Sequence, residues 1–370
     1  MKQIIRWGIW GSGTIAHKLA SDVRLADGAV LHAVASRTEE HARQFAQQFG
    51  AAKWYGGLEP LLNDPEVDAV YIATPNHRHM DDCIAAVEAG KAVLCEKPFA
   101  LSHAQTQRIV DAARRRKVFC MEAMWTRFIP AVIEARRLID TGAIGTVRLI
   151  QGHFAFPARV SNDARHLNIA MGGGALLDIG VYPISFAHYL LGAPQSIKGT
   201  AYIGPTGVDL QSAYQLGFAN GVMADLWSSF LIEGTNDFTV FGDDGMLRLC
   251  KPFYAAHRLI LQTGKNPGTA GQHPKSAPSG LRKFFAGLRD TPAAWSVRRR
   301  LSPALEALSG GSARSLPFPG KGYQFEINEV NRCLREQRTE SAVMPLDGSL
   351  AVMRTMDALR AQWGLVYPQE

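Results

Sequence analysis

The stretch GIWGSGTIA, residues 8–16, decides the fold of the first third of the chain. It follows a β-forming run at residues 4–10 and opens a segment, residues 14–26, whose apolar side chains recur at near-helical spacing. Its core, Gly11-x-Gly13-x-x-Ala16, provides a tight turn, close backbone approach and a small residue where helix meets strand. The free N–H groups at the start of such a helix favour phosphate. The sequence therefore predicts a dinucleotide held by Gly11, Ser12, Gly13, Thr14 and Ile15.

Alternating strands and helices continue beyond the glycine stretch. Strands that alternate with helices pair in parallel, so the pattern predicts a doubly wound α/β sheet, a Rossmann domain, over residues 1–122. The predicted strands are residues 4–10, 30–36, 67–74, 92–95 and 118–121, and the predicted helices are residues 14–26, 39–49, 79–89 and 102–116.

The pattern changes in the rest of the chain, where strand follows strand without crossover helices. Asn220-Gly221 is a two-residue hairpin signal between two of these strands. Residues 123–370 are predicted to form a second α/β domain with an open, mostly antiparallel sheet, covered by helices on one face. Residues 263–319 are rich in Gly, Pro, Ser, Lys and Arg and are predicted to be an atypical basic insertion. The predicted strands are residues 147–156, 196–204, 214–218, 222–230 and 238–241, and the predicted helices are residues 129–140, 174–191 and 348–364.

Composition limits the class of protein. The chain is 46% hydrophobic and 20% charged, as is ordinary for a globular protein, and no apolar run approaches the ~20 residues of a membrane span. Five scattered cysteines without a CxxC pair favour reduced thiols and a cytoplasmic location. The net charge of +7 is concentrated in residues 281–301, which lack any base-reading motif. Neither nucleic acid nor a membrane is therefore expected as a partner.

The residues after the second predicted strand bear on which dinucleotide binds. An NAD enzyme usually places an acid there for the ribose hydroxyls, whereas this chain has Ser36, Arg37 and Thr38. A hydroxyl and a guanidinium suit a 2′-phosphate. NADP is therefore favoured as the cofactor, with NAD as the alternative, unless Arg37 is simply a basic residue at a helix start.

Two further motifs lie at the ends of predicted strands, where doubly wound sheets bind their ligands. One is Ala73-Thr74-Pro75-Asn76-His77 and the other is Glu96-Lys97-Pro98. No metal is expected, because no third ligand is spaced to join His77 and His79. Taken alone, Lys97 could also be a solvated lysine in a surface turn. The residues expected to contact the cofactor here are Thr74, Pro75, Asn76, His77, Glu96 and Lys97.

In their order and spacing, these motifs resemble the glucose–fructose oxidoreductase/inositol dehydrogenase/rhizopine catabolism (Gfo/Idh/MocA) family. Residues 122–128, EAMWTRF, and 172–183, GGGALLDIGVYP, are similar to the branch with dihydrodiol dehydrogenase and NADP-dependent D-xylose dehydrogenase. The resemblance covers about residues 4–250 and 321–367 and offers no counterpart for residues 263–319. It implies an active site where the second sheet faces the nicotinamide and a lysine, here Lys97, that points into it, commonly with a cis bond before the proline. It also implies a homodimer or higher homo-oligomer formed through the C-terminal sheet.

Oxidation of an alcohol needs a hydride acceptor and a proton acceptor held in one geometry. Tyr182 is the candidate base, and Asp178 precedes it by four residues, which places both side chains on one helix face. An ammonium such as Lys97 would lower the pKa of the phenol, while Asp178 would hold a substrate hydroxyl or orient the lysine. Many family members have histidine in place of Tyr182, so Lys97 itself stays open as the proton acceptor. A buried tyrosine that only completes a hydrogen bond is the structural alternative.

The substrate is expected to contact residues that follow the last predicted strand of the first domain. For Trp125 the alternative is interdomain core, and for Arg165 and Asn168 it is a surface loop. The predicted function is an NAD(P)-dependent oxidoreductase that moves a hydride between the nicotinamide and a hydroxyl carbon of a sugar or related polyhydroxylated ring. The alternative is a non-catalytic dinucleotide-binding sensor of the same fold, against which Lys97 and Tyr182 argue. The expected substrate-binding residues are Trp125, Arg127, Phe154, Arg165 and Asn168.

Overall fold

The glycine turn lies at the carboxyl end of β1, in the middle of a six-stranded parallel sheet. The computed structural model describes residues 3–158, 164–264 and 311–370. Strand order is β3-β2-β1-β4-β5-β6, which is the Rossmann order. Every residue of β4 and β5 is buried, as expected for parallel strands covered on both faces. The strands are β1 (Ile5–Trp10), β2 (Ala29–Ser36), β3 (Lys53–Gly56), β4 (Ala69–Ile72), β5 (Ala92–Glu96) and β6 (Cys120–Ala123).

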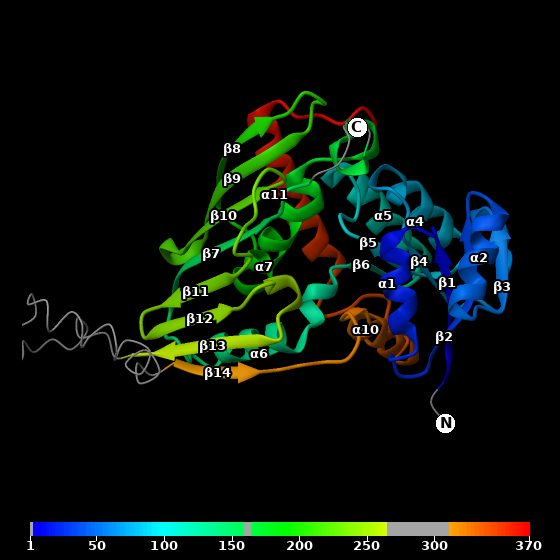
Figure 1. The fold of residues 1–370 in the computed structure, drawn as a ribbon, viewed down its shortest axis with the longest axis horizontal. Coiled ribbons are helices and arrows are strands. Elements are labelled where there is room, and N and C mark those ends of the chain that lie inside the picture. The colour runs from blue at the N-terminus through cyan, green and yellow to red at the C-terminus, as the bar shows by residue number, and fades with distance from the viewer. Residues whose placement is uncertain (1–2, 159–163, 265–310) are drawn as a thin grey trace, which may run out of the picture.

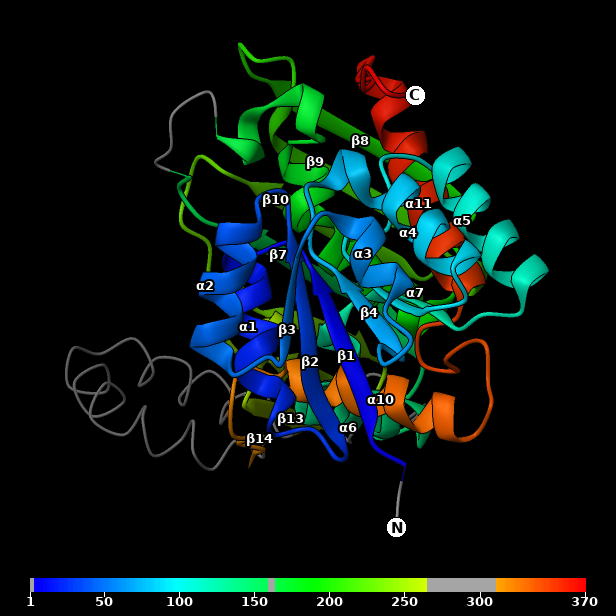
Figure 2. The ribbon, with the colours of Figure 1, turned by 90° about the vertical axis from the view of Figure 1, so that its right-hand side faces the viewer.

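Helices cover both faces of this sheet (Figure 2). On one face lie α1 (Thr14–Val23) and α2 (Glu39–Phe49), and on the other lie α3 (Leu58–Asn63), α4 (His79–Glu88) and α5 (His103–Arg116). The parallel α/β prediction is confirmed. Strand β3 and helix α3 were not predicted, because a four-residue strand whose side chains alternate between half-buried and exposed gives little hydrophobic signal.

The second sheet has eight strands in the order β14-β13-β12-β11-β7-β10-β9-β8. Only β7 and β10 pair in parallel, so the predicted open, mostly antiparallel sheet is confirmed. The hairpin signal is confirmed too, since Asn220 and Gly221 connect β9 to β10 with φ of 59° and 73°. The strands are β7 (Val147–Ala155), β8 (Ser196–Ile203), β9 (Asp209–Gly217), β10 (Met223–Ser229), β11 (Phe238–Gly242), β12 (Gly245–Leu249), β13 (Arg258–Thr263) and β14 (Gly311–Ser315).

Helices of the second half lie between the two sheets (Figure 1). Helix α7 (Val181–Leu191) packs on β7 and β10, and α6 (Pro130–Asp140) packs on β12 and β13. Helix α11 (Leu346–Trp363) contacts β8, α7 and α5, while α10 (Tyr323–Arg335) packs on α1. The predicted helix at residues 174–191 does not begin as regular α-helix, because Leu176–Gly180 forms a π-helical turn before α7 begins at Val181.

The predicted insertion at residues 263–319 is too long at its C-terminal end. Gly311–Ser315 is strand β14, which pairs with β13 at the edge of the second sheet. Polar residues at this edge position gave no apolar alternation from which a strand could be predicted. Residues 265–310, which include most of the predicted insertion and all of the basic residues 281–301, lie outside the described residues.

Within the described part of the chain, one helical run, Ile169–Leu191, is long and apolar enough to match a membrane span by length and composition. In this structure 83% of its most apolar window is buried inside the protein, which is how the core helix of a folded domain behaves.

Candidate active site

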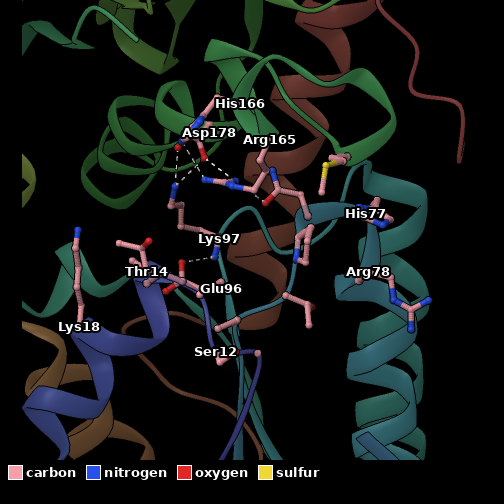
Figure 3. Close-up of a pocket in the computed structure, with 18 of the residues that line it drawn as sticks. Ser12, Thr14, Lys18, His77, Arg78, Glu96, Lys97, Arg165, His166 and Asp178 are labelled. Atoms are coloured by element: carbon pink, nitrogen blue, oxygen red, sulfur yellow. Dashed lines mark hydrogen bonds and ion pairs between the residues drawn. The ribbon is translucent and has the colours of Figure 1, made fainter. Parts of the chain in front are cut away.

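A cavity of about 1270 Å³ opens between the two sheets at the carboxyl ends of β1, β4 and β5 (Figure 3). The glycine turn and the Glu96-Lys97 stretch border it from the first sheet, and the segment from Arg165 to Tyr182 borders it from the second half of the chain. Among the predicted cofactor residues, these line the cavity: Gly11, Ser12, Gly13, Thr14, Ile15, Ser36, Arg37, Thr74, Pro75, Asn76, His77, Glu96 and Lys97.

The glycine turn fits the pyrophosphate of a dinucleotide. Gly11 has φ of +104°, and a Cβ there would lie 2.8 Å from the carbonyl oxygen of Ala73, so only glycine is accommodated. Gly13 faces open space and precedes α1, whose first turn carries no capping side chain and no acid. The first N–H groups of α1 therefore stay available for phosphate. The hydroxyls of Ser12 and Ser36 lie 3.0 Å apart beside them.

Thr38 lies at the N-cap of α2 and is not among the residues that line the cavity, contrary to its expected contact with the cofactor. His41, in the first turn of α2, also lines the cavity, although no motif in the sequence marks it.

Lys97 and Asp178 meet across the cavity (Figure 3). The Lys97 Nζ donates a hydrogen bond to the carbonyl oxygen of Asp178 at 2.6 Å and lies 3.6 Å from its Oδ1. The Arg165 guanidinium lies 3.3 Å from the same Oδ1, and His166 Nε2 lies 3.9 Å from Oδ2. Burial disfavours the carboxylate, but Lys97 and Arg165 outweigh burial and hold the pKa of Asp178 at about 2. Burial likewise disfavours the ammonium, but Tyr182, Asp178 and Glu96 raise the pKa of Lys97 above its ordinary value.

Tyr182 lies beside this ion pair, with the Lys97 Nζ 4.8 Å from its ring centroid. Its hydroxyl accepts a hydrogen bond from Trp125 Nε1 at 3.2 Å. Lys97 does act to lower the pKa of the phenol, but burial acts more strongly and raises that pKa to about 12. Lys97 thus acts on the phenol in the expected direction, but desolvation of the phenolate exceeds the attraction of the ammonium.

Glu96 anchors the turn that carries Lys97. The Tyr71 hydroxyl donates a hydrogen bond to Glu96 Oε1, and the backbone N–H of Lys97 donates to Oε2 at 3.2 Å. Burial raises the pKa of Glu96 above its ordinary value. The bond between Lys97 and Pro98 is cis, in agreement with the family resemblance.

Three of the five predicted substrate residues line the cavity: Trp125, Phe154 and Arg165. Trp125 also stacks on Tyr323, with ring centroids 4.9 Å apart, so it belongs to both the cavity wall and the core. Tyr254 stacks on Phe154 at 4.3 Å and completes an aromatic wall. No motif marks Tyr254 or Tyr323, because each reaches the cavity from a distant part of the chain.

Arg127 and Asn168, the other two residues expected to contact the substrate, do not line this cavity. Arg127 is buried and donates hydrogen bonds to the side chain and carbonyl oxygen of Ser185 and to the carbonyl oxygen of Val343. Trp125 and Arg127 share one 3₁₀ turn, Trp125–Phe128, which directs them to different sides. The Asn168 side chain accepts a hydrogen bond from the Ala170 N–H and shapes its own loop.

Among the residues that the structure describes, one group of side chains that could hold a metal ion lies outside the cavity, at His32, Asp64 and Glu66. The Lys53 Nζ lies 2.6 Å from Glu66 and 3.2 Å from Asp64, so the chain itself balances this negative charge.

A Rossmann sheet with a phosphate-binding turn, facing a second open sheet across a charged and aromatic cavity, is typical of dinucleotide-dependent oxidoreductases. The chain belongs to the Gfo/Idh/MocA family. Residues 5–124 match the model described as "Oxidoreductase family, NAD-binding Rossmann fold", and residues 132–248 match the "GFO/IDH/MocA C-terminal domain". The protein is therefore an oxidoreductase with an NAD-binding Rossmann domain.

Relatives match along the whole chain. The chain is 31% identical to trans-1,2-dihydrobenzene-1,2-diol dehydrogenase of Danio rerio, with 99% of each chain covered. It is 29% identical to D-xylose 1-dehydrogenase (NADP(+)) of Hypocrea jecorina, over 99% of this chain and 93% of the relative. The fold also matches the aldose-aldose oxidoreductase from Caulobacter crescentus, with a TM-score of 0.79, 23% identity and 98% of each chain covered. A 3-ketoreductase from Actinomadura kijaniata, solved with NADP, gives a TM-score of 0.74 at 24% identity, with 97% of each chain covered.

Proposed function

We propose that this protein is an NADP-dependent dehydrogenase or reductase acting on a CH–OH carbon of a sugar or related polyhydroxylated ring. The observation that carries the proposal is the pairing of Lys97, from the dinucleotide-binding half, with Asp178, from the other half, inside one cavity. Residues 1–122 would form the cofactor domain and residues 123–370 the substrate domain.

The side chains around Lys97 support hydrogen-bond donation to a substrate oxygen. With a raised pKa for Lys97 and a pKa of about 12 for Tyr182, both groups carry protons at neutral pH. Two donors aimed at one oxygen would stabilise an alkoxide and supply a proton when a carbonyl is reduced. The bound nicotinamide would supply or accept the hydride. Asp178, held ionised, would accept a hydrogen bond from a neighbouring hydroxyl and orient Lys97.

Two open alternatives for the proton remain, Lys97 and Tyr182. Tyr182→Phe removes only the hydroxyl, and Lys97→Met removes only the ammonium. The group whose loss lowers kcat by about 100-fold or more is the proton carrier, and the other is a hydrogen-bonding partner.

The preference for NADP rests on the residues around Arg37. Ser36, Arg37 and His41 line the cavity next to the glycine turn without a carboxylate at the end of β2. A guanidinium and a hydroxyl match a phosphate better than a ribose diol. A relative named for NADP(+) points in the same direction.

The substrate class rests on the two kinds of surface in the cavity. Phe154, Tyr254 and Trp125 offer aromatic faces, which suit the C–H face of a ring. Asp178 and Arg165 offer an acceptor and donors for hydroxyls. Relatives named for a dihydrodiol and for D-xylose are consistent with such a ring.

Turnover assays test the proposal directly. The purified protein would be incubated with NADP or NAD and a panel of pentoses, hexoses, inositols and cyclic diols, and reduced cofactor would be followed by its near-ultraviolet absorbance. Steady reduction of NADP by one ring of the panel supports the proposal. Tight NADPH binding without turnover on any ring, in either direction, would instead favour the non-catalytic sensor.

We also propose that two copies pair through the outer face of the second sheet. Phe241, Leu149 and Met223 are neighbours in one row across β11, β7 and β10, and 59% of Met223 is exposed. Successive side chains of a strand point to opposite faces of the sheet, so this row lies on the face opposite to the buried Ile150. Phe218 and Phe230, which follow β9 and β10, are buried in the core and do not belong to this face. The five free cysteines support the proposal of a reducing, cytoplasmic location.

A further inference from the structure

Residues 365–370, which follow α11, lie against the loop that forms one rim of the cavity. Tyr367 is buried, and its hydroxyl donates a hydrogen bond to the carbonyl oxygen of Gly173 at 2.7 Å. Gln369 Nε2 donates to the carbonyl oxygen of Ala170, also at 2.7 Å. Two carbonyl groups of one loop are thus held by the C-terminal segment. Figure 1 marks the chain end beside the turns that precede α7.

That loop, residues 165–174, presents side chains to the cavity. Arg165, His166 and Met171 line the pocket. The loop is closed by its own backbone, since the Gly174 N–H donates to the carbonyl oxygen of His166 at 2.8 Å. The Asp178 N–H donates to the carbonyl oxygen of Gly174 at 3.1 Å. A shift of the loop would therefore also shift the backbone of Asp178.

Residues 365–370 are held in turn by Arg360, a buried residue of α11. The guanidinium binds both carboxylate oxygens of Glu370, at 3.0 and 2.6 Å, and lies 4.9 Å from the centre of the Tyr367 ring. It also donates to the carbonyl oxygen of Leu101 at 3.2 Å. Leu101 lies in the short stretch, residues 97–102, that leads from Lys97 and Pro98 at the end of β5 to the start of α5. Arg360 therefore ties the strand-end segment of Lys97 to the C-terminal residues.

We propose that residues 365–370 are a positioning element of the active site. Through Arg360 on one side and Tyr367 with Gln369 on the other, they set the spacing between the Lys97 segment and the loop that carries Arg165 and leads to Asp178. The inference rests on the proposed function, because these residues would act by maintaining the distance between Lys97 and Asp178. Neither Tyr367 nor Gln369 lines the cavity, so each acts through the loop and not on the substrate.

Two variants test this without a large risk to folding. Tyr367→Phe removes one hydroxyl, and Gln369→Ala changes an exposed side chain. Each is expected to lower kcat/KM for the ring substrate by about 5- to 50-fold, because small misplacement of reacting groups is costly. The Kd for NADPH should stay within about twofold, since the glycine turn is untouched. The matched control is Tyr55→Phe, whose hydroxyl donates to Asp64 at 3.0 Å outside the cavity and should leave kcat and KM unchanged.

Amide hydrogen exchange gives a readout that does not depend on turnover. Exchange at residues 170–178 should be faster in Tyr367→Phe and Gln369→Ala than in the wild type, with the strands of both sheets unchanged. Unchanged exchange in this loop, or wild-type kcat/KM in both variants, would overturn the inference. A wild-type protein without turnover would contradict the proposed function, while exchange would still decide the positioning role.

Discussion

Replacing Lys97 with methionine separates catalysis from cofactor binding in this cavity. Lys97 is almost fully buried, and its ammonium contacts the carbonyl and carboxylate oxygens of Asp178 and the ring of Tyr182. None of these contacts involves the phosphate-binding turn. Methionine keeps a chain of similar length and apolar bulk and removes only the charge and the donors.

The expected loss follows from what the ammonium does there. A group that exchanges a proton with the reacting oxygen contributes about 100- to 10,000-fold to kcat, equivalent to about 3 to 5 kcal/mol of the barrier. The fold should tolerate the change, because Asp178 keeps the Arg165 guanidinium at 3.3 Å and stays paired. NADPH affinity should change less than about threefold, since phosphate binding depends on the start of α1.

Steady-state kinetics and NADPH fluorescence titration measure the two quantities separately. Lys91→Met is a matched control, because Lys91 is also buried and its Nζ also donates to backbone carbonyls, of Asp64 and Val67, at 2.6 and 2.9 Å. Lys91 lies just before the other end of β5, outside the cavity. The control should lose stability but keep kcat. A Lys97→Met enzyme with kcat within about threefold of wild type would refute the assignment.

Four further predictions follow from charges and exposed surface. Arg37→Ala should weaken NADPH binding by about 10-fold or more and NADH binding hardly at all, and equal losses would contradict the 2′-phosphate argument. Alcohol oxidation should accelerate as pH rises from neutral, because the proton acceptor, whether it is Lys97 or Tyr182, must first lose its own proton; a flat profile would count against both candidates. Both carboxylate oxygens of the buried Glu326 lack a hydrogen-bond partner among the described residues, and burial raises its pKa well above the ordinary value. The folded state therefore keeps a proton that the unfolded chain releases above its own lower pKa, so this group destabilises the fold increasingly as pH rises. Glu326→Met should raise the free energy of unfolding by about 1 to 3 kcal/mol near pH 8 and by less near pH 4, and an equal gain at both would show that titration is not the cause. Met223→Glu should convert a dimer to a monomer in light scattering after gel filtration, with Lys198→Glu on the same face as the charge control.

The cofactor half of the site was predictable from the sequence because its chemistry is local. The glycine turn, the residues after β4 and the residues after β5 each follow a recognisable strand, and parallel topology gathers strand ends at one edge. The same reasoning failed at Arg127, since the direction of a side chain on one 3₁₀ turn depends on what packs behind it. Tyr254 and Tyr323 carried no signal, because their place in the cavity depends on how β12, β13 and α10 pack.

The ionisation states of the site were not predictable either, because each depends on both halves of the chain. Asp178 is buried, and its carboxylate stays charged only because Lys97 reaches it from β5 and Arg165 from the loop. Only 11% of the Lys97 side chain is exposed, and its ammonium persists because Tyr182 and Asp178 face it from the other half. Separated, each group would be driven toward its neutral form by desolvation. The charged pair is therefore a property of the packed interface between the sheets, and any change that widens the interface should first appear as altered proton chemistry, before the fold or the cofactor site is lost.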